Sequence, residues 1–413
     1  MPDEGARTPG LLTMDRIVVV GASVAGVNVV EALRQGGFEG DVTLVGAEPQ
    51  LPYDRPPLSK EALKAGPGAA DVALRPRDWY DEHGIALRLG QRAVRLSAAA
   101  RQVVLADGSR LPYDGLVIAT GSAVRTWNQT EQTGPVRVLR TLSDAAALHA
   151  ELRPGRHIVI IGAGFIGLEI AATARELGLA ASVIEIEAAP LARVVGAETG
   201  RWFADLHAAH GVSVHVGSRI ERIERSGDQS KIALSDGTHL TADLVVAGVG
   251  VTPATAWLGG SNISIDDGVV CDARLRTTLP GVVAAGDIAR WHNPLFGHDM
   301  RVEHWLNAVE QGKHAALSLL GSDEPYTHVP YFWSDQFGEK IHSVGITSDA
   351  DVSAVRRLDA NGISVVFGRH GVVRGALCVN APRDVARYRQ AIRDRTPWED
   401  LVPEPNRSPQ WPT

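Results

Sequence analysis

The sequence predicts an α/β protein, chiefly because one pattern occurs twice. At residues 17–48 and again at 158–185, an apolar strand runs into a glycine-rich turn, a helical stretch and a second apolar strand that ends in an acid. Strands alternate with helical stretches up to about residue 320, as in parallel sheets covered by helices. After residue 321 strand-like runs follow one another directly, which is typical of an antiparallel sheet. We therefore expect two Rossmann-like dinucleotide-binding domains, one inserted in the other, and a C-terminal α+β domain.

The first glycine-rich turn has the sequence GASVAG at residues 21–26. In such a turn the first glycine allows a tight bend, the middle small residue lets the backbone approach a pyrophosphate, and the last lets the helix pack on the sheet. Ser23 replaces the middle glycine and is small enough to fit, with a hydroxyl within reach of a phosphate. An acid at the end of the second strand binds a ribose diol. The candidate cofactor-binding residues here are Gly21, Ser23, Gly26 and Glu48.

The second turn, GAGFIG at residues 162–167, has the full pattern. Glycine-rich turns also occur for packing alone, but two copies with strand, helix and terminal acid favour dinucleotide binding. The candidates in this copy are Gly162, Gly164, Ile166, Gly167 and Glu185.

Two apolar strands mark the ends of the insertion, one before the second copy and one at residues 244–250 after it. Gly250, which ends the latter strand, is a further candidate for cofactor binding. We expect the first nucleotide domain at residues 14–120 and 249–320, and the second at 121–248. Residues 1–13 are expected to be a disordered lead-in.

Turn cues predict smaller features in each domain. Asp-Gly pairs between apolar runs predict a β-meander in both nucleotide domains, and a helix is expected near residues 384–393 of the C-terminal domain, residues 321–413. The Asp-Gly cues lie at 106–108 and 235–237, and the expected C-terminal strands at 341–346, 363–367 and 372–379.

Composition excludes several classes of protein. The formal net charge of −7 argues against a nucleic-acid-binding protein. The two cysteines, Cys271 and Cys378, form no C-x-x-C arrangement, so we expect neither a thiol relay nor a disulfide framework, and a reducing cytoplasm fits. No apolar run approaches the roughly 18 residues of a membrane span. The histidines form no metal-binding pattern, and His207 and His210 are expected on the surface.

Four further segments resemble a known family. Residues 52–60 (PYDRPPLSK), Gly286-Asp287, residues 302–305 (VEHW) and residues 332–336 (FWSDQ) together are similar to the FAD-dependent NADH:ferredoxin reductases. Those enzymes serve Rieske-type dioxygenases and bacterial cytochromes P450. The resemblance covers nearly the whole chain and is more specific than either glycine motif.

The resemblance implies that the first nucleotide domain holds FAD. It places Ala25 and Glu48 on the cofactor and Lys60 beside the isoalloxazine ring. Such enzymes usually have an aspartate just before the glutamate that ends the second strand. In this chain that position is Ala47, so ribose recognition would depend on Glu48 alone. The other FAD-site residues that it implies are Arg55, Ala93, Arg140, Asp287 and Trp305.

Two of these residues also have a physical reason. A carboxylate after an apolar strand and Gly286 suits the ribityl hydroxyls, although a Gly-Asp pair is often only a turn. A helix that begins near Trp305 would direct its positive N-terminal end at the pyrimidine end of reduced flavin, which becomes anionic. The alternative is that Trp305 is a core residue.

Lys60 and Glu169 are expected to act together. Glu169 is expected on the first turn of the helix that follows the second glycine turn. The resemblance implies that it meets both the nicotinamide amide and Lys60 near flavin N5. Buried ion pairs must be fully satisfied to be tolerated. The alternative is that Glu169 only complements its helix dipole and Lys60 is solvated.

Charge favours NADH over NADPH. Glu185 would bind an unmodified ribose 2′-hydroxyl and repel a 2′-phosphate, and Glu187 adds to that repulsion. By resemblance Arg193 clamps the adenosine end of NADH, which leaves NADPH as second choice.

Two features concern the electron acceptor. The resemblance places Trp333 near the flavin, where the iron–sulfur partner docks, although a tryptophan there is more often a core residue. The arginines near the C-terminus suggest a docking surface for an acidic ferredoxin, with a solvated helix face as the alternative. They are Arg383, Arg387, Arg389, Arg393 and Arg395.

The sequence therefore predicts a cytoplasmic flavoprotein that moves a hydride from NADH to FAD and single electrons to a [2Fe-2S] ferredoxin. That ferredoxin would feed a Rieske oxygenase or a cytochrome P450. The alternatives are an NADH oxidase that uses oxygen, and an NADH-binding flavoprotein of the apoptosis-inducing-factor type that acts by association.

Overall fold

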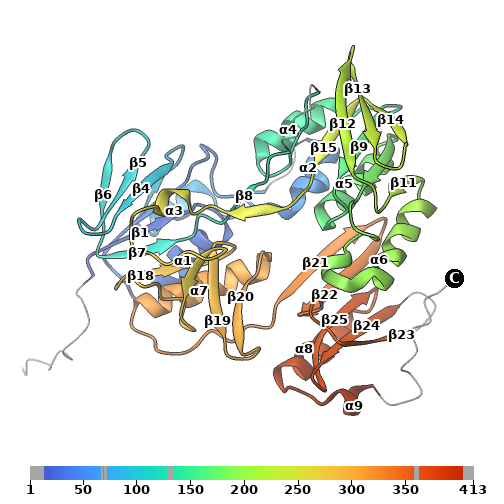
Figure 1. Ribbon diagram of the computed structural model, residues 1–413. Helices are drawn as coiled ribbons and strands as arrows, with labels where there is room; N and C mark the ends of the chain where they lie inside the picture. The colour runs from blue at the N-terminus through green and yellow to red at the C-terminus, as the bar shows by residue number, and fades with distance from the viewer. Residues whose placement is uncertain (1–13, 67, 69–71, 128–133, 358–361, 403–413) are drawn as a thin grey trace, which may run out of the picture. The chain divides into compact units, whose positions relative to one another are not determined.

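A computed structural model describes residues 14–66, 68, 72–127, 134–357 and 362–402 (Figure 1). The expected lead-in at residues 1–13 lies outside these. The chain divides into two compact units, and it passes between them several times. The first unit comprises Met1–Asp54, Ala73–Ser122 and Thr252–His328, and the second comprises Arg55–Val72, Ala123–Val251 and Val329–Thr413.

A parallel five-stranded sheet is the centre of the first unit. Its strand order is β18-β7-β1-β2-β3, and every neighbouring pair is parallel. Because β18 follows the second nucleotide fold in sequence yet pairs with β7, the predicted insertion is confirmed. The strands are β1 (Arg16–Val20), β2 (Asp41–Val45), β3 (Ile85–Arg88), β7 (Gly115–Ile118) and β18 (Val282–Ala284).

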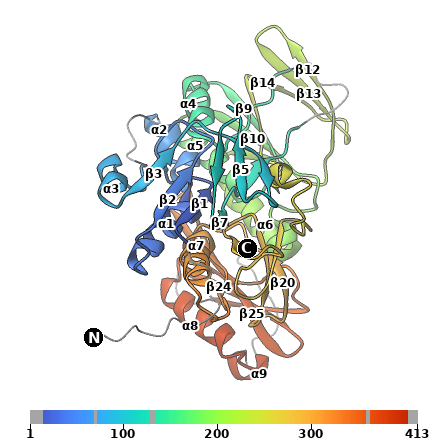
Figure 2. The same cartoon turned by 90° about the vertical axis from the view of Figure 1, so that its left-hand side faces the viewer.

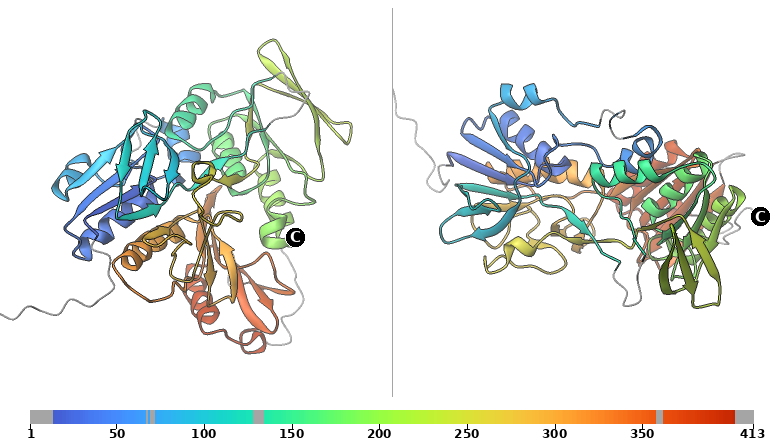
Figure 3. Two further views of the ribbon diagram at one scale, coloured as in Figure 1. Left: turned by 60° about the vertical axis from the view of Figure 1, so that its left-hand side comes forward. Right: turned by 90° about the horizontal axis from the view of Figure 1, so that it is seen from above.

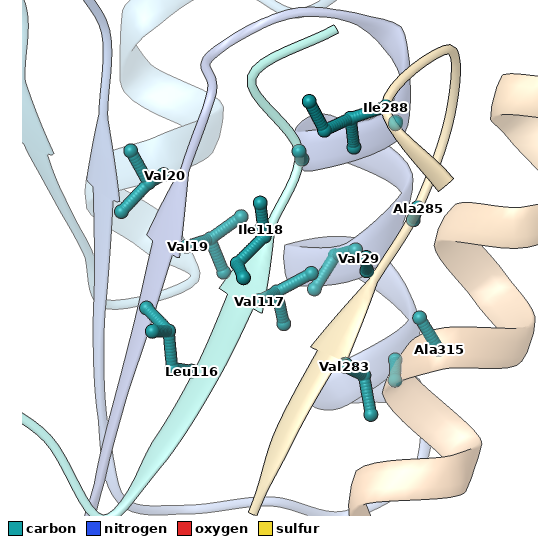
Figure 4. Packing of buried hydrophobic residues seen from close by; sticks show 14 of the residues in the cluster. Val19, Val20, Val29, Leu116, Val117, Ile118, Val283, Ala285, Ile288 and Ala315 are labelled. Carbon is teal, nitrogen blue, oxygen red and sulfur yellow. The ribbon is translucent and has the colours of Figure 1, made fainter. Parts of the chain in front are cut away.

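Two helices of the first unit, α1 (Val24–Gln35) and α7 (Trp305–Leu319), lie side by side (Figure 2). Figure 4 shows Val29 of α1 and Ala315 of α7 among the side chains of β1, β7 and β18. The two helices cross closely, because a Cβ atom at Gly312 would lie 2.5 Å from the Ala25 carbonyl oxygen.

The rest of the first unit consists of short elements. The predicted meander is confirmed as an antiparallel sheet, β4-β5-β6 (Figure 3, cyan). The strands β8 (Ser122–Val124) and β16 (Val251–Pro253) lie where the chain leaves and re-enters the unit. The remaining elements are α3 (Arg77–Glu82), β4 (Ala93–Ser97), β5 (Gln102–Leu105), β6 (Arg110–Pro112), η2 (Ala256–Leu258), β17 (Val269–Cys271), β19 (Ala289–Asn293) and β20 (His298–Arg301).

The second unit contains the second nucleotide fold. Its parallel sheet has the order β11-β10-β9-β15, and the predicted second meander is the antiparallel sheet β12-β13-β14 (Figure 3, yellow-green). Its strands are β9 (His157–Ile161), β10 (Ala180–Ile184), β11 (Val212–His215), β12 (Ile220–Ser226), β13 (Gln229–Leu234), β14 (His239–Ala242) and β15 (Leu244–Ala247). Its helices are η1 (Pro56–Ser59), α2 (Glu61–Ala65), α4 (Leu142–Glu151), α5 (Phe165–Glu176) and α6 (Ala192–Ala209).

The predicted C-terminal antiparallel sheet is confirmed, with the order β21-β22-β25-β24-β23. The expected helix is α8 (Pro382–Arg393), which packs on β22 and β25. The strands β21 and β23 were not predicted, because their sequences, YFWSDQ and VSAVRR, show no regular alternation of apolar and polar residues. The strands are β21 (Tyr331–Gln336), β22 (Glu339–Gly345), β23 (Val352–Arg357), β24 (Ile363–Arg369) and β25 (Val372–Val379), followed by α9 (Trp398–Leu401).

Candidate functional site

The first glycine turn requires its glycines for folding. Gly21 has φ +123°, and a Cβ atom there would lie 2.0 Å from the Ala119 carbonyl oxygen. A Cβ at Gly26 would lie 2.0 Å from the Gly21 carbonyl oxygen, so only glycine lets α1 approach the turn. Ser23 is the N-cap residue of α1, and its side chain makes no capping hydrogen bond. Its hydroxyl and the helix N-terminus can therefore both serve a phosphate group.

The loop at Gly286 lies against the start of α1. Gly286 has φ +81°, and a Cβ atom there would be 3.1 Å from the Cβ of Ala25. Gly286 thus lies beside the N-terminal turn of α1, and Asp287 is the next residue in the chain. The Asp287 carbonyl accepts a hydrogen bond of 3.1 Å from Arg301, which fixes the backbone there.

Two residues of the PYDRPPLSK segment hold other candidates in the first unit. The Tyr53 hydroxyl donates to Glu48 Oε2 at 2.6 Å, and Trp305 Nε1 donates to Asp54 Oδ1 at 2.6 Å. Trp305 is the first residue of α7, as predicted, and its half-buried side chain packs against the hydrophobic core of the first unit. Tyr53 and Asp54 were not singled out from the sequence, although they lie within a segment that the resemblance marked.

In the second glycine turn, the middle glycine has free space beside its backbone, whereas the outer two do not. Gly162 has φ +100°, and a Cβ atom there would lie 2.5 Å from the Gly248 carbonyl oxygen, while one at Gly167 would lie 2.2 Å from the Gly162 oxygen. At Gly164, in contrast, an added Cβ meets no protein atom within 4 Å. The middle glycine is thus unnecessary for packing, which fits a backbone kept bare for a dinucleotide pyrophosphate.

The acid that ends β10 is fixed by backbone hydrogen bonds. Glu185 accepts from the Ala163 N–H at 2.8 Å and from the Glu187 N–H at 3.0 Å. Arg193 pairs with Glu187, with its Nε at 2.7 Å and its Nη2 at 2.6 Å from the same carboxylate oxygen. The Arg193 side chain is 77% exposed, so this pair lies at the surface.

Lys60 and Glu169 form a buried ion pair. Lys60 Nζ lies 2.9 Å from Glu169 Oε2, and the side chains are only 13% and 7% exposed. The alternative in which Lys60 is solvated is therefore wrong. Glu169 lies one turn further into α5 than expected, because the helix begins at Phe165.

Hydroxyl groups complete the surroundings of Glu169. Ser59 Oγ donates to Glu169 Oε2 at 2.5 Å, and Ser334 Oγ donates to Oε1 at 2.6 Å. The Ser59 carbonyl also accepts from Thr173 Oγ1 at 2.8 Å, which attaches η1 to α5. Neither serine was predicted as a partner of Glu169, although both lie in segments that carry the family resemblance.

Trp333 and Ser334 lie on opposite faces of β21, because side chains alternate along a strand. Ser334 faces α5, whereas Trp333 pairs across the sheet with His342 and stacks with Tyr331 at 6.3 Å. Trp333 is partly exposed. It is therefore not an interior core residue.

The remaining candidates lie on several elements. Arg55 Nη1 donates to the Arg140 carbonyl at 3.2 Å within the second unit, just before α4, which begins with a capping box at Thr141. Ala93 begins β4 in the first unit. Gly250 has φ +92° with no protein atom within 4 Å of an added Cβ, and Ile166, at the start of α5, is 49% exposed.

His207 is not on the surface, contrary to expectation. It is fully buried, and burial lowers the pKa of its imidazole to about 4. The sequence contained a signal for this, because the buried positions Val195, Thr199, Phe203 and His207 follow one another at intervals of four along α6. Only His210 of the predicted pair remains exposed.

Both cysteine thiols are buried and unpaired. Cys271 and Cys378 are free and buried, and burial raises the pKa of both, that of Cys378 to about 12. Over the described ranges there is no group of three or more His, Cys, Asp or Glu residues that could hold a metal ion. Of the helices in those ranges, none is long and apolar enough to cross a membrane.

Comparisons with known proteins agree with this geometry. A family model described as pyridine nucleotide-disulphide oxidoreductase matches residues 15–312, and one described as reductase C-terminal matches residues 331–402. The chain is 38% identical to the ferredoxin–NAD(+) reductase component of the anthranilate 1,2-dioxygenase system of Burkholderia cepacia, over 92% of this chain and 95% of that protein. It is 35% identical to putidaredoxin reductase of Pseudomonas putida over 93% of each.

Solved structures lead to the same family. The ferredoxin reductase for the CYP199A2 system from Rhodopseudomonas palustris matches with a TM-score of 0.85 and 37% identity, over 90% of this chain and 93% of that one. Putidaredoxin reductase in its covalent complex with putidaredoxin matches with a TM-score of 0.87 and 33% identity, over 94% and 97%. The chain belongs to the pyridine nucleotide-disulphide oxidoreductase family and, within it, to the FAD-dependent ferredoxin reductases.

Proposed function

We propose that this protein takes a hydride from NADH onto FAD and passes electrons one at a time to a [2Fe-2S] ferredoxin in the cytoplasm. The ferredoxin then feeds a Rieske oxygenase or a cytochrome P450. The observation that carries the proposal is the combination of two dinucleotide turns with two buried, unreactive thiols. With no thiol pair to receive electrons, the acceptor must lie outside the chain. FAD supplies the needed chemistry, since nicotinamide gives two electrons together and an iron–sulfur cluster takes one.

Each domain has a proposed task. Residues 14–120 and 249–320 bind FAD, residues 121–248 bind NADH, and residues 321–413 contribute the surface for the partner. The FAD site uses Gly21, Ser23, Ala25, Gly26, Glu48, Arg55, Lys60, Ala93, Arg140, Asp287 and Trp305. The NADH site uses Gly162, Gly164, Ile166, Gly167, Glu169, Glu185, Arg193 and Gly250.

Lys60 and Glu169 are proposed to act at the reacting ends of the two cofactors. A carboxylate has about four lone-pair sites, and three of those on Glu169 are taken by Ser59, Ser334 and Lys60. One site remains to accept an N–H from the nicotinamide amide. The ion pair in turn fixes the Lys60 ammonium group at a defined place for the flavin.

Docking of the ferredoxin is proposed to involve α8 and Trp333. Arg383, Arg387 and Arg393 are exposed on or at the end of α8, while Asp384 is buried and accepts from Ser364 at 2.8 Å. The exposed face of the helix is therefore locally positive on a chain with a net charge of −7. A positive patch of this kind steers an acidic partner and makes the association rate depend on salt.

Stopped-flow spectroscopy tests the function. After reduction by NADH, we expect the flavin to be reoxidised at least tenfold faster by a [2Fe-2S] ferredoxin than by air, roughly the steering gain for a matched charged partner. Added salt should slow only the ferredoxin reaction, and Trp333→Ala should slow it without changing reduction by NADH. Equal reoxidation by air and by ferredoxin would identify an oxidase instead. A protein that stays reduced with both acceptors would favour the associating flavoprotein.

We also propose that NADH is preferred over NADPH. Glu185 is anchored by two backbone N–H groups, so it cannot easily turn away from a 2′-phosphate. Arg193, the cation that could bind such a phosphate, is paired with Glu187. The charge of Arg193 is therefore balanced by Glu187.

Glu187→Gln is expected to lower the KM for NADPH about tenfold, because a freed guanidinium makes a charge-assisted bond to phosphate. The KM for NADH should change by less than about threefold on the same reasoning. Steady-state kinetics with both nucleotides measures this. Adding Arg193→Gln to Glu187→Gln should remove the gain, and an unchanged KM for NADPH in the single variant would show that this pair does not control selectivity.

A further inference from the structure

A chain of hydrogen bonds leads away from Glu169 through the C-terminal sheet to α6. Ser334 Oγ bonds to Glu169 Oε1 at 2.6 Å, Gln336 Nε2 bonds to Ser334 Oγ at 3.0 Å, and His207 Nε2 bonds to Gln336 Oε1 at 3.0 Å. All four residues are buried, and all belong to the second unit. We call these three hydrogen bonds the relay.

The relay has one possible direction. A carboxylate only accepts, so Ser334 must give its single hydroxyl proton to Glu169. The Ser334 oxygen then accepts from the Gln336 amide nitrogen, which turns the amide oxygen toward His207. Because a carbonyl oxygen only accepts, His207 must carry its proton on Nε2.

Burial determines the protonation state of His207, the last residue of the relay. His207 Nδ1 has no hydrogen-bond partner among the described residues, and the imidazole is fully buried. A neutral ring with its proton on Nε2 leaves only an acceptor unpaired, whereas a charged ring would bury a second donor against nothing. The lowered pKa of His207, caused mainly by burial, agrees with a neutral ring.

We propose that Ser334, Gln336 and His207 are positioning residues that hold Glu169 in the orientation needed for nicotinamide binding. The proposal rests on the function proposed above, in which Glu169 meets the nicotinamide amide. Without the relay, the carboxylate is held only through Oε2, where both Ser59 and Lys60 bind, and it can rotate about that side. The C-terminal sheet thus contributes to the nucleotide site as well as to the partner surface.

Reversing the relay is the sharpest test. Gln336→Glu has nearly the same shape but only accepts, so Ser334 would donate to the new carboxylate and leave Glu169. We expect the Kd of the FAD-loaded protein for NAD+ to rise about tenfold, which is typical of losing a hydrogen bond to a charged group. Ser334→Ala should give a similar rise without burying a new charge. The measurement is a fluorescence titration with NAD+, with the unfolding midpoint recorded for each variant.

Matched variants separate positioning from packing. His207→Gln keeps a donor for Gln336 and should bind NAD+ more tightly than His207→Leu, which has none. His210→Ala, at the C-cap of α6, removes a ring that stacks on Phe337 but belongs to none of the three hydrogen bonds, and this variant should bind as the wild type does. Because no electron acceptor is used, a failure of the ferredoxin assignment does not affect this titration. An unchanged Kd in both Gln336→Glu and Ser334→Ala would overturn the proposal.

Discussion

Gly164→Ala is expected to weaken NADH binding by about 30-fold while leaving the stability of the fold unchanged. An alanine Cβ at this position meets no protein atom within 4 Å, and Gly164 has φ −76°, which any residue adopts. The added methyl group would instead occupy the space where the backbone approaches the pyrophosphate. A loss of 30-fold corresponds to about 2 kcal/mol of binding free energy. The KM for NADH, the Kd for NAD+ and thermal unfolding measure the two effects separately.

Gly162→Ala is the matched control for this prediction. Here the residue has φ +100°, and the Cβ atom would lie 2.5 Å from the Gly248 carbonyl oxygen. This variant should lose several kcal/mol of stability, since both a strained backbone and a steric clash are introduced. If Gly164→Ala binds NADH normally, the second turn does not face the pyrophosphate. If it unfolds as readily as Gly162→Ala, the middle glycine has a packing role after all.

Breaking the Lys60–Glu169 pair is expected to have the second large effect. Glu169→Leu leaves the Lys60 ammonium group buried without its carboxylate partner. Lys60→Met leaves the Glu169 carboxylate buried without its ammonium partner. Removal of one member of a buried pair typically costs about 3 kcal/mol or more of stability. Each variant should also slow reduction of the flavin by NADH about 100-fold, within the range seen for a lost electrostatic or proton-transfer group. Denaturant unfolding and rapid-mixing kinetics give the two values.

The double variant Lys60→Met, Glu169→Leu distinguishes stability from activity. Apolar replacement of both partners is often neutral for stability, so the double variant should regain stability but not its rate of flavin reduction. Lys64→Met is the control, because Lys64 of α2 and Glu176 of α5 form an exposed pair at 2.5 Å, whereas Lys60 is the residue just before α2. Such a pair contributes about 1 kcal/mol at most. Recovery of the full rate in the double variant would show that the pair serves only the fold.

Local patterns carried most of the fold prediction. Glycine spacing, terminal acids and alternation of strand and helix are short-range signals, and they predicted both nucleotide folds, both meanders and the helix α8. The strand β21 was missed because its sequence has no regular alternation, and contacts with distant residues decide its two faces. Phe332 meets Phe165 of α5 at 4.5 Å, and Trp333 lies opposite His342 of β22.

The hydrogen-bond and ion-pair partners at the candidate site were harder to predict from the sequence. Ser59 and Ser334 are separated from Glu169 by 110 and 165 positions, and no local pattern links them. The pairing of Arg193 with Glu187 was also unforeseen, although the residues are only six positions apart. An ion pair depends on how a loop and a helix end approach each other, and composition does not encode that approach.

From the sequence alone came the two dinucleotide turns, the serine at the middle of the first, and the absence of a C-x-x-C arrangement among its two cysteines. Those properties depend on residue type at fixed spacing, because backbone geometry at a turn depends on adjacent residues. The tertiary structure alone decided that Lys60 is buried against Glu169, and that Ser334, Gln336 and His207 line up behind that carboxylate. Buried polar groups must find partners wherever the fold supplies them, and here three separate segments of the chain provide those partners.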